Sequence, residues 1–243
     1  MTNKLVYRAI ERSLESCYNR KGEPSTELPV SIEIISGQDV HDIHHKDLAY
    51  RKEHSDNFDF EKYCEYIYSL FEGEFVGQVV ENRYRRKLSD FMTIDRFASC
   101  IPAIVSEPMK DFIEKQGLFA NEYKFIPITV YNRGEIVIMK YYLWIVPHMP
   151  GNAIKWEKSL FAYSRPKMTD DGIVVIKSEE EYLKTRPRPN SVLLLEVDER
   201  YAGYQVLNTS FGLFLTRQIH TTMRFCGFTG YKTIDTLMFI DEE

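Results

Sequence analysis

The sequence predicts an α+β protein, a single globule with two strand–helix–strand units around a mixed sheet and a peripheral N-terminal extension. Short runs of β-branched and aliphatic residues recur along the chain, as in strands. Two of these runs are followed directly by an amphipathic stretch that ends in glycine, which is typical of a helix packed on its own strands. No stretch has the composition of an interdomain linker. We therefore expect residues 1–84 to form an extension packed on a main domain of residues 85–243.

The composition is that of a globular chain with a mildly acidic surface. The 243 residues are 44% hydrophobic, and 31 Lys and Arg stand against 36 Asp and Glu, a formal net charge of −5. This balance excludes a nucleic-acid binder that works by net charge, because phosphate neutralisation needs a basic surface. No stretch approaches the ~20 apolar residues of a membrane helix, and charges interrupt the N-terminus too early for a signal peptide. We expect a cytoplasmic protein with no nucleic-acid or membrane partner.

The cysteines give no sign of a disulfide framework or a zinc site. Cys17, Cys64, Cys100 and Cys226 lie far apart in the sequence, so the close pairs of a zinc or redox motif are absent. Separate thiols in a reducing compartment are the favoured interpretation. Glycine-rich phosphate-binding loops are absent too, so no cofactor is expected.

The first strand–helix–strand unit lies in the middle of the chain. The apolar run at 103–105 is followed by Ser106, a favoured N-cap residue, and then by an acidic residue and Pro108, which suit a first helical turn. Apolar residues recur through the next turns, and Gly117 is expected to end the helix. A strand over 123–128 completes the unit.

The second unit repeats this arrangement near the C-terminus. The apolar run at 213–215 precedes Thr216, which is predicted to cap the helix with its side chain, and Gly227 closes the amphipathic stretch before a further strand. When the two runs are aligned, their closing glycines fall within one residue of each other. The sequence therefore predicts helices over 107–116 and 217–226 in two structurally repeated units.

The remaining elements follow from shorter patterns. A strand is predicted over 30–35, and a helix with Asp59 as its N-cap is predicted to stop at Gly73. The stretch 39–57 is polar and charged, and no element is assigned to it. Three further strands and a hairpin turn are expected at 136–146, 173–176, 192–197 and Arg133-Gly134.

One cluster in the sequence resembles a metal-ligand set. His41, His44 and His45 would share one face of a helix, with Asp39 and Asp47 beside them. Imidazole with carboxylate is ordinary ligation for first-row metals. The spacing of the zinc-hydrolase motif is absent, so a solvated polar segment is favoured. A metal-dependent hydrolase that uses this cluster stays open as an alternative.

A second group of residues is predicted to bind a protein partner. Acidic side chains belong on the rim of such an interface and tyrosines at its centre. Loop and turn positions near strand ends present side chains that the core does not need. The structural alternative is that Ser178 is the N-cap of a helix and that the acidic run forms its first turn. The candidates are Glu179, Glu180, Glu181, Asp198, Glu199, Tyr201 and Tyr204.

Several segments together resemble a known family through their order and spacing. They are Lys87-Leu88-Ser89-Asp90-Phe91-Met92, Pro102-Ala103-Ile104-Val105-Ser106-Glu107, Tyr123-Lys124-Phe125-Ile126-Pro127-Ile128, Tyr141-Tyr142-Leu143-Trp144, Ala153-Ile154-Lys155-Trp156-Glu157-Lys158-Ser159, Gly212-Leu213-Phe214-Leu215-Thr216 and Gly227-Phe228-Thr229-Gly230. This set resembles the bacterial immunity-protein family eleven, a former domain of unknown function first described in myxobacterial proteins. The resemblance covers residues 85 to 240 or so.

The resemblance implies a function by binding. Members of that family are assigned as immunity proteins of polymorphic toxin systems, and no catalytic residues carry over to this chain. It implies that the chain binds and neutralises a cognate protein toxin without being an enzyme. A non-catalytic adaptor module is the further alternative.

Overall fold

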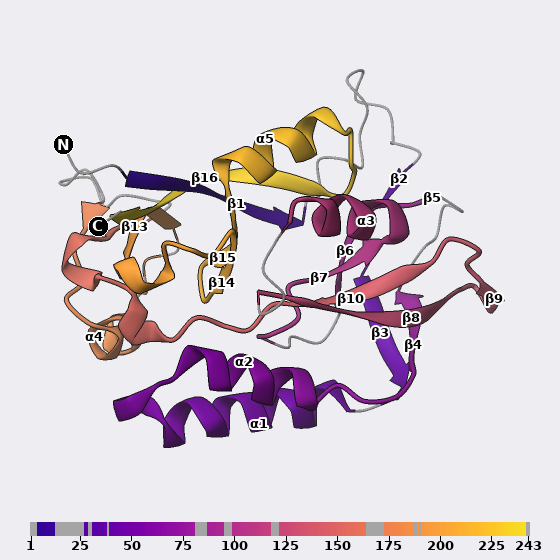
Figure 1. The fold of residues 1–243 in the computed structure, drawn as a ribbon, viewed down its shortest axis with the longest axis horizontal. Helices are drawn as coiled ribbons and strands as arrows, with labels where there is room; N and C mark the ends of the chain where they lie inside the picture. The colour runs from indigo at the N-terminus through magenta and orange to yellow at the C-terminus, as the bar shows by residue number, and fades with distance from the viewer. Residues whose placement is uncertain are drawn as a thin grey trace.

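The structure, a computed structural model, describes residues 4–12, 27–28, 31–37, 39–80, 87–94, 99–117, 122–163, 173–186, 189 and 191–241. It confirms the predicted α+β class (Figure 1). The strands form two seven-stranded sheets and one short parallel pair, β2 (Glu27–Leu28) with β5 (Lys87–Leu88). In the described part of the chain, no helix is long and apolar enough to span a membrane.

The first sheet closes on itself. Its order is β10 (Tyr141–Ile145), β7 (Ala103–Ser106), β6 (Phe91–Ile94), β3 (Ser31–Ser36), β4 (Phe75–Val80), β8 (Lys124–Asn132) and β9 (Glu135–Ile136). Because β10 pairs with β8 as well as with β7, six of these strands form a closed ring, and β9 is the outer arm of a hairpin. Gly77 lies inside the ring, where an added Cβ would stand 2.4 Å from Ile32 Cγ2 and 2.9 Å from Ile128 Cδ1. Only glycine fits there without a shift of its neighbours.

The second sheet is open. Its order is β12 (Ile173–Val174), β11 (Leu160–Ala162), β13 (Ser191–Val197), β16 (Tyr231–Asp241), β1 (Lys4–Arg12), β15 (Gly212–Thr216) and β14 (Val206–Thr209). The chain crosses from the ring to this sheet just after β10, where His148 bridges Asn208 of β14. A buried apolar cluster fills the space between the two sheets and the helices.

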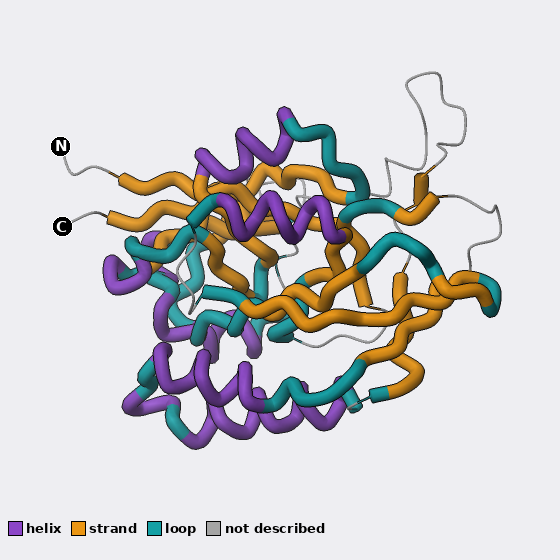
Figure 2. Tube along the Cα trace, turned by 45° about the vertical axis from the view of Figure 1, so that its right-hand side comes forward, coloured by secondary structure: helices purple, strands orange, loops and turns teal. Residues whose placement is uncertain are grey.

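The helices form layers on both sides of the sheets. Helices α1 (Val40–Glu53) and α2 (Phe60–Ser69) run side by side below the ring, and α3 (Glu107–Lys115) and α5 (Arg217–Phe225) lie above the strands (Figures 1 and 2). The remaining helical elements are short: η2 connects α1 to α2, and α4, η3, η4 and η5 lie in the connections of the open sheet. Their bounds are α4 (Glu179–Lys184), η2 (Ser55–Asn57), η3 (Gly151–Ala153), η4 (Trp156–Lys158) and η5 (Glu199–Tyr201).

Both predicted strand–helix–strand units are present, in different sheets. Strands β7 and β8 flank β10 and are antiparallel to it, and β15 and β16 flank β1 in the same way. The helices α3 and α5 end before Gly117 and Gly227, which have φ of 68° and 72°, a conformation that favours glycine. Ser106 Oγ accepts a hydrogen bond from the Met109 amide at 3.4 Å, whereas the Thr216 side chain makes no capping bond. The predicted side-chain cap at Thr216 is therefore wrong, although the helix begins where expected.

The predicted peripheral position of the N-terminal segment is wrong. Strand β1 lies in the interior of the open sheet between β16 and β15, and β3 and β4 are neighbouring strands of the ring. Residues 4–12 read Lys-Leu-Val-Tyr-Arg-Ala-Ile-Glu-Arg, and this local pattern gives no sign that both edges of the strand are paired. Pairing partners more than two hundred residues away in the sequence, such as Arg8 with Leu237, decide its place.

Other elements differ from the prediction in extent. The polar stretch 39–57 contains the long helix α1, and the expected strand over 136–146 is divided into β9 and β10. The expected strand over 173–176 is paired only at β12, while those over 30–35 and 192–197 are confirmed as β3 and β13. The turn Arg133-Gly134 has φ of 57° and 84°, as a tight hairpin requires.

Candidate functional site

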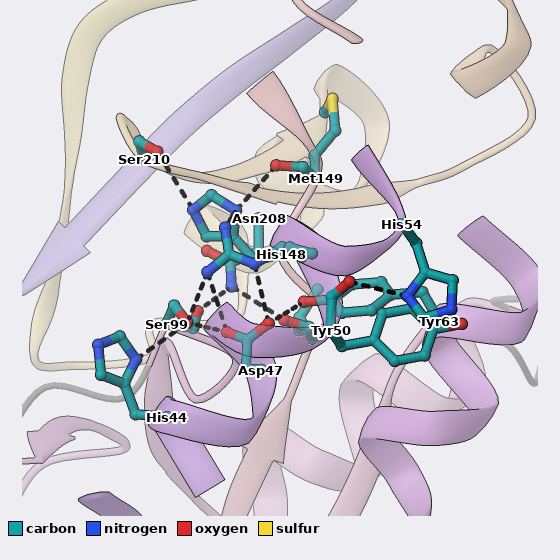
Figure 3. A network of polar contacts seen from close by, with 12 residues as sticks. His44, Asp47, Tyr50, His54, Tyr63, Ser99, His148, Met149, Asn208 and Ser210 are labelled. Atoms are coloured by element: carbon teal, nitrogen blue, oxygen red, sulfur yellow. Dashed lines mark hydrogen bonds and ion pairs between the residues drawn. The ribbon is translucent and has the colours of Figure 1, made fainter. Parts of the chain in front are cut away.

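A network of buried polar side chains lies where the two sheets meet (Figure 3). We call it the junction network. It joins α1 and α2 to the loop before β7, to the crossing after β10 and to β14. Its members are Asp47, Arg51, Tyr63, Ser99, His148 and Asn208.

The network begins on α1, a helix with little apolar surface. Its buried residues are Val40, Ile43 and Asp47, which lie on one stripe facing the ring. A carboxylate thus occupies a core position of the helix, with no exposed surface. Such a group needs hydrogen-bond donors on every side, because burial of an unpaired charge is very costly.

Asp47 receives these donors from three elements. Arg51, one turn later, donates through Nε to Oδ1 at 2.9 Å and through Nη2 to Oδ2 at 3.1 Å. The Tyr63 hydroxyl of α2 donates to Oδ1 at 2.6 Å, and the Ser99 hydroxyl donates to Oδ2. The carboxylate therefore fixes α1, α2 and the loop before β7 to one another.

Arg51 and His148 extend the network to the crossing between the sheets. Arg51 Nη1 lies 3.2 Å from His148 Nδ1, and His148 Nε2 lies 3.4 Å from Ser210 Oγ. Burial, followed by the nearby Arg51 charge, lowers the pKa of His148 to about 4. The imidazole is neutral at physiological pH. The Met149 carbonyl oxygen lies 2.8 Å from Nδ1 and can only accept, so Nδ1 carries the proton and donates to it, and the Arg51 guanidinium packs beside the ring.

Asn208 holds the crossing itself. Its side-chain Nδ2 donates to the backbone oxygens of Ser99 at 2.6 Å and Val146 at 2.9 Å. Its backbone carbonyl oxygen accepts a hydrogen bond from the Met149 amide at 2.7 Å. The side chain is buried and both amide protons are used, although the run Asn208-Thr209-Ser210 matches a glycosylation pattern. This asparagine serves to join the two sheets.

The arrangement of Ser99, His44 and Asp47 is unlike that of a nucleophilic triad. The Ser99 hydroxyl has one proton and donates it in a hydrogen bond to the Asp47 carboxylate, which can only accept. His44 Nδ1 lies 3.4 Å from Ser99 Oγ and must donate if it bonds there, so it is not placed as a base for this serine. Burial also raises the pKa of the neighbouring Cys100 thiol far above its usual range, which suppresses the thiolate.

The histidine cluster predicted as a metal alternative lies on α1, with its side chains spread along the helix. His41 and His45 are exposed, and their ring centroids are 6.2 Å apart, while His44 is half-buried and turned toward Ser99. Within the described residues, no three His, Cys, Asp or Glu side chains are placed to hold a metal ion together.

The predicted acidic residues lie on two short elements that contact one connection of the chain. Glu179 of α4 fills the space that a side chain at Gly151 would occupy, and Glu199 of η5 pairs with Lys155 at 2.5 Å. Gly151 and Lys155 belong to the segment 151–158, which contains η3 and η4. We call the predicted acidic set the acidic rim: Glu179, Glu180, Glu181, Asp198 and Glu199.

Four residues of the acidic rim bond to nearby groups of the same chain. Glu180 forms an ion pair with Lys184, and Asp198 Oδ1 accepts a hydrogen bond from Nε of Arg200 at 2.9 Å. Glu181 accepts from the Lys177 amide at 2.7 Å, and Ser178 caps α4 as predicted. Hydrogen bonds to Arg200 and to Lys155 lower the pKa values of Asp198 and Glu199, so both are ionised at neutral pH. The surface therefore carries alternating charges.

The two predicted tyrosine anchors differ in exposure. Tyr201 is 5% exposed and packs edge-on against Phe60 of α2 at 5.3 Å between ring centroids. It is a core residue, because the turn at 198–203 folds inward onto α2, so the side chain is not at the surface where the sequence placed it. Tyr204 is half-buried, 6.0 Å from Tyr201, and keeps one side at the surface.

The sequence contained little signal for the junction network. Asp47 and Arg51 have the spacing of an ordinary surface ion pair on a helix, and only tertiary packing makes the pair internal. Ser99 and Asn208 are isolated polar residues in their segments. The one usable sign was Asp47 on the same helical stripe as Val40 and Ile43.

Two comparisons with known proteins found no match for the chain. No protein-family model matches it, and none of the curated proteins matches it. The resemblance to immunity-protein family eleven therefore stays a prediction that rests on the segments quoted above.

Proposed function

We propose that this chain is a cytoplasmic immunity protein that binds a cognate bacterial toxin and neutralises it without catalysis. The observation that carries the proposal is the meeting of two acidic segments, separated in sequence, on the connection 151–158. Short elements on a rigid sheet present charged side chains in fixed positions, which is the arrangement that protein recognition uses.

The interior supports the same proposal. The polar side chains of the junction network bond to one another and to the backbone, so their chemistry is used to join helices and sheets. A protein that acts by masking another needs complementary surface and a stable frame. The network supplies the frame, and α4 with η5 supplies the surface.

The paired charges on the acidic rim refine the expected mode of binding. Glu180, Asp198 and Glu199 already pair with Lys184, Arg200 and Lys155, so a basic toxin would replace these three partners with its own cations. Exposed pairs of this kind contribute little to stability, and exchanging them is inexpensive. We expect the rim to set the rate of association and Tyr204 to contribute to the lifetime of the complex.

The test is a binding measurement with the protein encoded next to this chain's gene. The wild type should form a stoichiometric complex with it, and Glu180→Lys with Glu199→Lys should slow association roughly tenfold or more. The matched control is Glu74→Lys with Glu135→Lys, which makes the same charge change at exposed sites on the ring and should leave the rate nearly unchanged. Equal effects of the two double variants would show that α4 and η5 lie outside the interface. The absence of any complex would contradict the proposed function.

A further inference from the structure

Helix α5 is less well stabilised by its own sequence than α3, its counterpart in the other strand–helix–strand unit. In α3, Ser106 caps the first turn and Glu107 places a negative charge at the positive end of the helix dipole. In α5, the Thr216 side chain makes no capping bond, and Arg217 places a positive charge at the same end. Residues 217–225 contain no aspartate or glutamate to offset this charge. The N-terminal end of α5 is therefore the weaker of the two.

The interior of α5 adds little helix propensity. His220, Thr221 and Thr222 follow one another in its middle turn, and histidine and threonine are poor helix formers. A helix of nine residues is also too short to persist in water by itself. Its stability comes from packing on the open sheet through its three buried residues, Ile219, His220 and Met223. If this contact is lost, the segment unfolds.

One of the three contacts with the sheet is made by a histidine. Helix α5 lies along β1 and β16 at the outside of the molecule (Figure 1), and it also contacts β15. His220 is 5% exposed, and its Nε2 lies 2.6 Å from Oγ1 of Thr233 in β16. The threonine hydroxyl can donate to a neutral imidazole or accept from a protonated one, but it carries no charge.

The charges around His220 have the same sign. Arg224 lies one turn later on α5, and Arg8 belongs to β1 beneath the helix. Strand β15 contributes no charged side chain, and burial raises the pKa of Tyr231 in β16 to about 12, so its phenol is neutral. Among the residues that the structure describes, the charges that act on His220 are therefore those of two arginines. A proton on this imidazole has no counter-charge there.

We propose that α5 is an acid-sensitive flap on the open sheet, released when the buried His220 gains a proton between Arg8 and Arg224. The third positive charge is hydrated only when the helix leaves the sheet, so protonation favours the open state. The opening is local, because the strand ladders of the open sheet do not depend on α5. It uncovers Leu213 and Leu215 of β15, which belong to the same apolar cluster as the buried face of the helix.

The direction of the pH dependence follows from these surroundings. Burial, followed by the charges of Arg224 and Arg8, lowers the pKa of His220 in the closed state below its ordinary value of 6.5. The open state keeps the ordinary value, so it binds the proton more tightly. Opening is therefore favoured as the pH falls below 6.5, by at most about tenfold per pH unit, because one proton is taken up.

The test is amide hydrogen exchange of the purified full chain, followed by mass spectrometry and corrected for the intrinsic exchange rates. It is measured at about pH 7.5 and about pH 5.5, on either side of the ordinary histidine pKa. We expect protection over 217–226 to fall several-fold at the lower pH. Protection over 107–116 should change less, because α3 contains no histidine. His220→Gln keeps a polar side chain that does not titrate and should make protection over 217–226 nearly independent of pH.

Two arginine variants separate the effect of His220 from that of the helix dipole. Arg224→Gln removes a charge that acts on His220 and should reduce the difference in protection between the two pH values. The matched control is Arg217→Gln, the same change on the same helix. It should raise protection alike at both pH values, because it removes a cation from the positive end of the dipole.

Three results would overturn the proposal. They are a wild type with equal protection over 217–226 at the two pH values, equal losses over 107–116 and 217–226, and a His220→Gln variant that keeps the wild-type pH dependence. The comparison of the two helices uses the wild type alone, so it decides the matter even if His220→Gln does not fold. None of these measurements requires a toxin, so the result is independent of the proposed function.

Discussion

Replacement of Asp47 by alanine should destabilise the protein by about 3–5 kcal/mol, the cost of breaking a buried ion pair by removing one partner. The carboxylate has no exposed surface and accepts four hydrogen bonds, from Arg51, Tyr63 and Ser99. Its removal leaves the Tyr63 hydroxyl and the guanidinium without their acceptor. The Arg51 side chain is 19% exposed and can be partly hydrated, which places the expected loss toward the lower end of that range.

Urea unfolding followed by circular dichroism measures this loss as a shift of the midpoint at constant slope. The matched control is Asp42→Ala on the same helix, since Asp42 pairs with Lys46 at 2.7 Å but its side chain is 58% exposed. The control should change the midpoint little, because exposed pairs are weak. A second control, Asp47→Ala with Arg51→Met, removes both charges and should recover part of the loss.

A loss below about 1 kcal/mol for Asp47→Ala would refute the reasoning, since it would fall in the range of a single ordinary hydrogen bond. Equal losses for Asp47→Ala and Asp42→Ala would do the same. A double variant less stable than Asp47→Ala alone would show that Arg51 stabilises the fold through contacts other than this pair.

Three further predictions follow from the fold. His148 gains its proton near pH 6.5 in the unfolded chain and only near pH 4 in the folded chain, so the free energy of unfolding should fall by up to ~3 kcal/mol as the pH is lowered from 6.5 to 4. In a pH series of urea midpoints, His148→Asn should flatten the curve over this range. An unchanged slope would contradict the assignment. Ser106→Ala should cost about 1 kcal/mol and Thr216→Ala less, because only Ser106 makes a capping bond; equal thermal shifts would contradict this. Gly77→Ala should cost about 1–3 kcal/mol by overpacking the ring, while Gly203→Ala, where an added Cβ meets nothing within 4 Å, should be nearly neutral in the same unfolding assay.

Local patterns in the sequence were sufficient for the elements that depend on local physics. The N-caps at Asp59, Ser106 and Ser178 and the stop at Gly117 were found because each signal lies within a few residues of the helix end that it determines. The helix α1 was missed because most of its surface is polar, so apolar periodicity is weak there.

The arrangement of the strands could not be obtained in the same way. The closure of the ring depends on β10 pairing with both β7 and β8, and the place of β1 depends on β15 and β16 at the other end of the chain. Non-local pairings of this kind are not encoded by the period of a single segment. The same reason explains why Tyr201 was placed at the surface, since its partner Phe60 belongs to a helix far away in the sequence.

The most direct test of the central proposal is a growth measurement. The gene next to this chain's gene is expressed in a sensitive bacterium alone, with the wild-type chain, and with the Glu180→Lys and Glu199→Lys variant, and colony-forming units are counted. The proposal predicts that the neighbouring product kills cells, that the wild-type chain restores growth and that the variant protects less well. A toxic product whose effect the wild-type chain does not relieve would contradict the proposed immunity function.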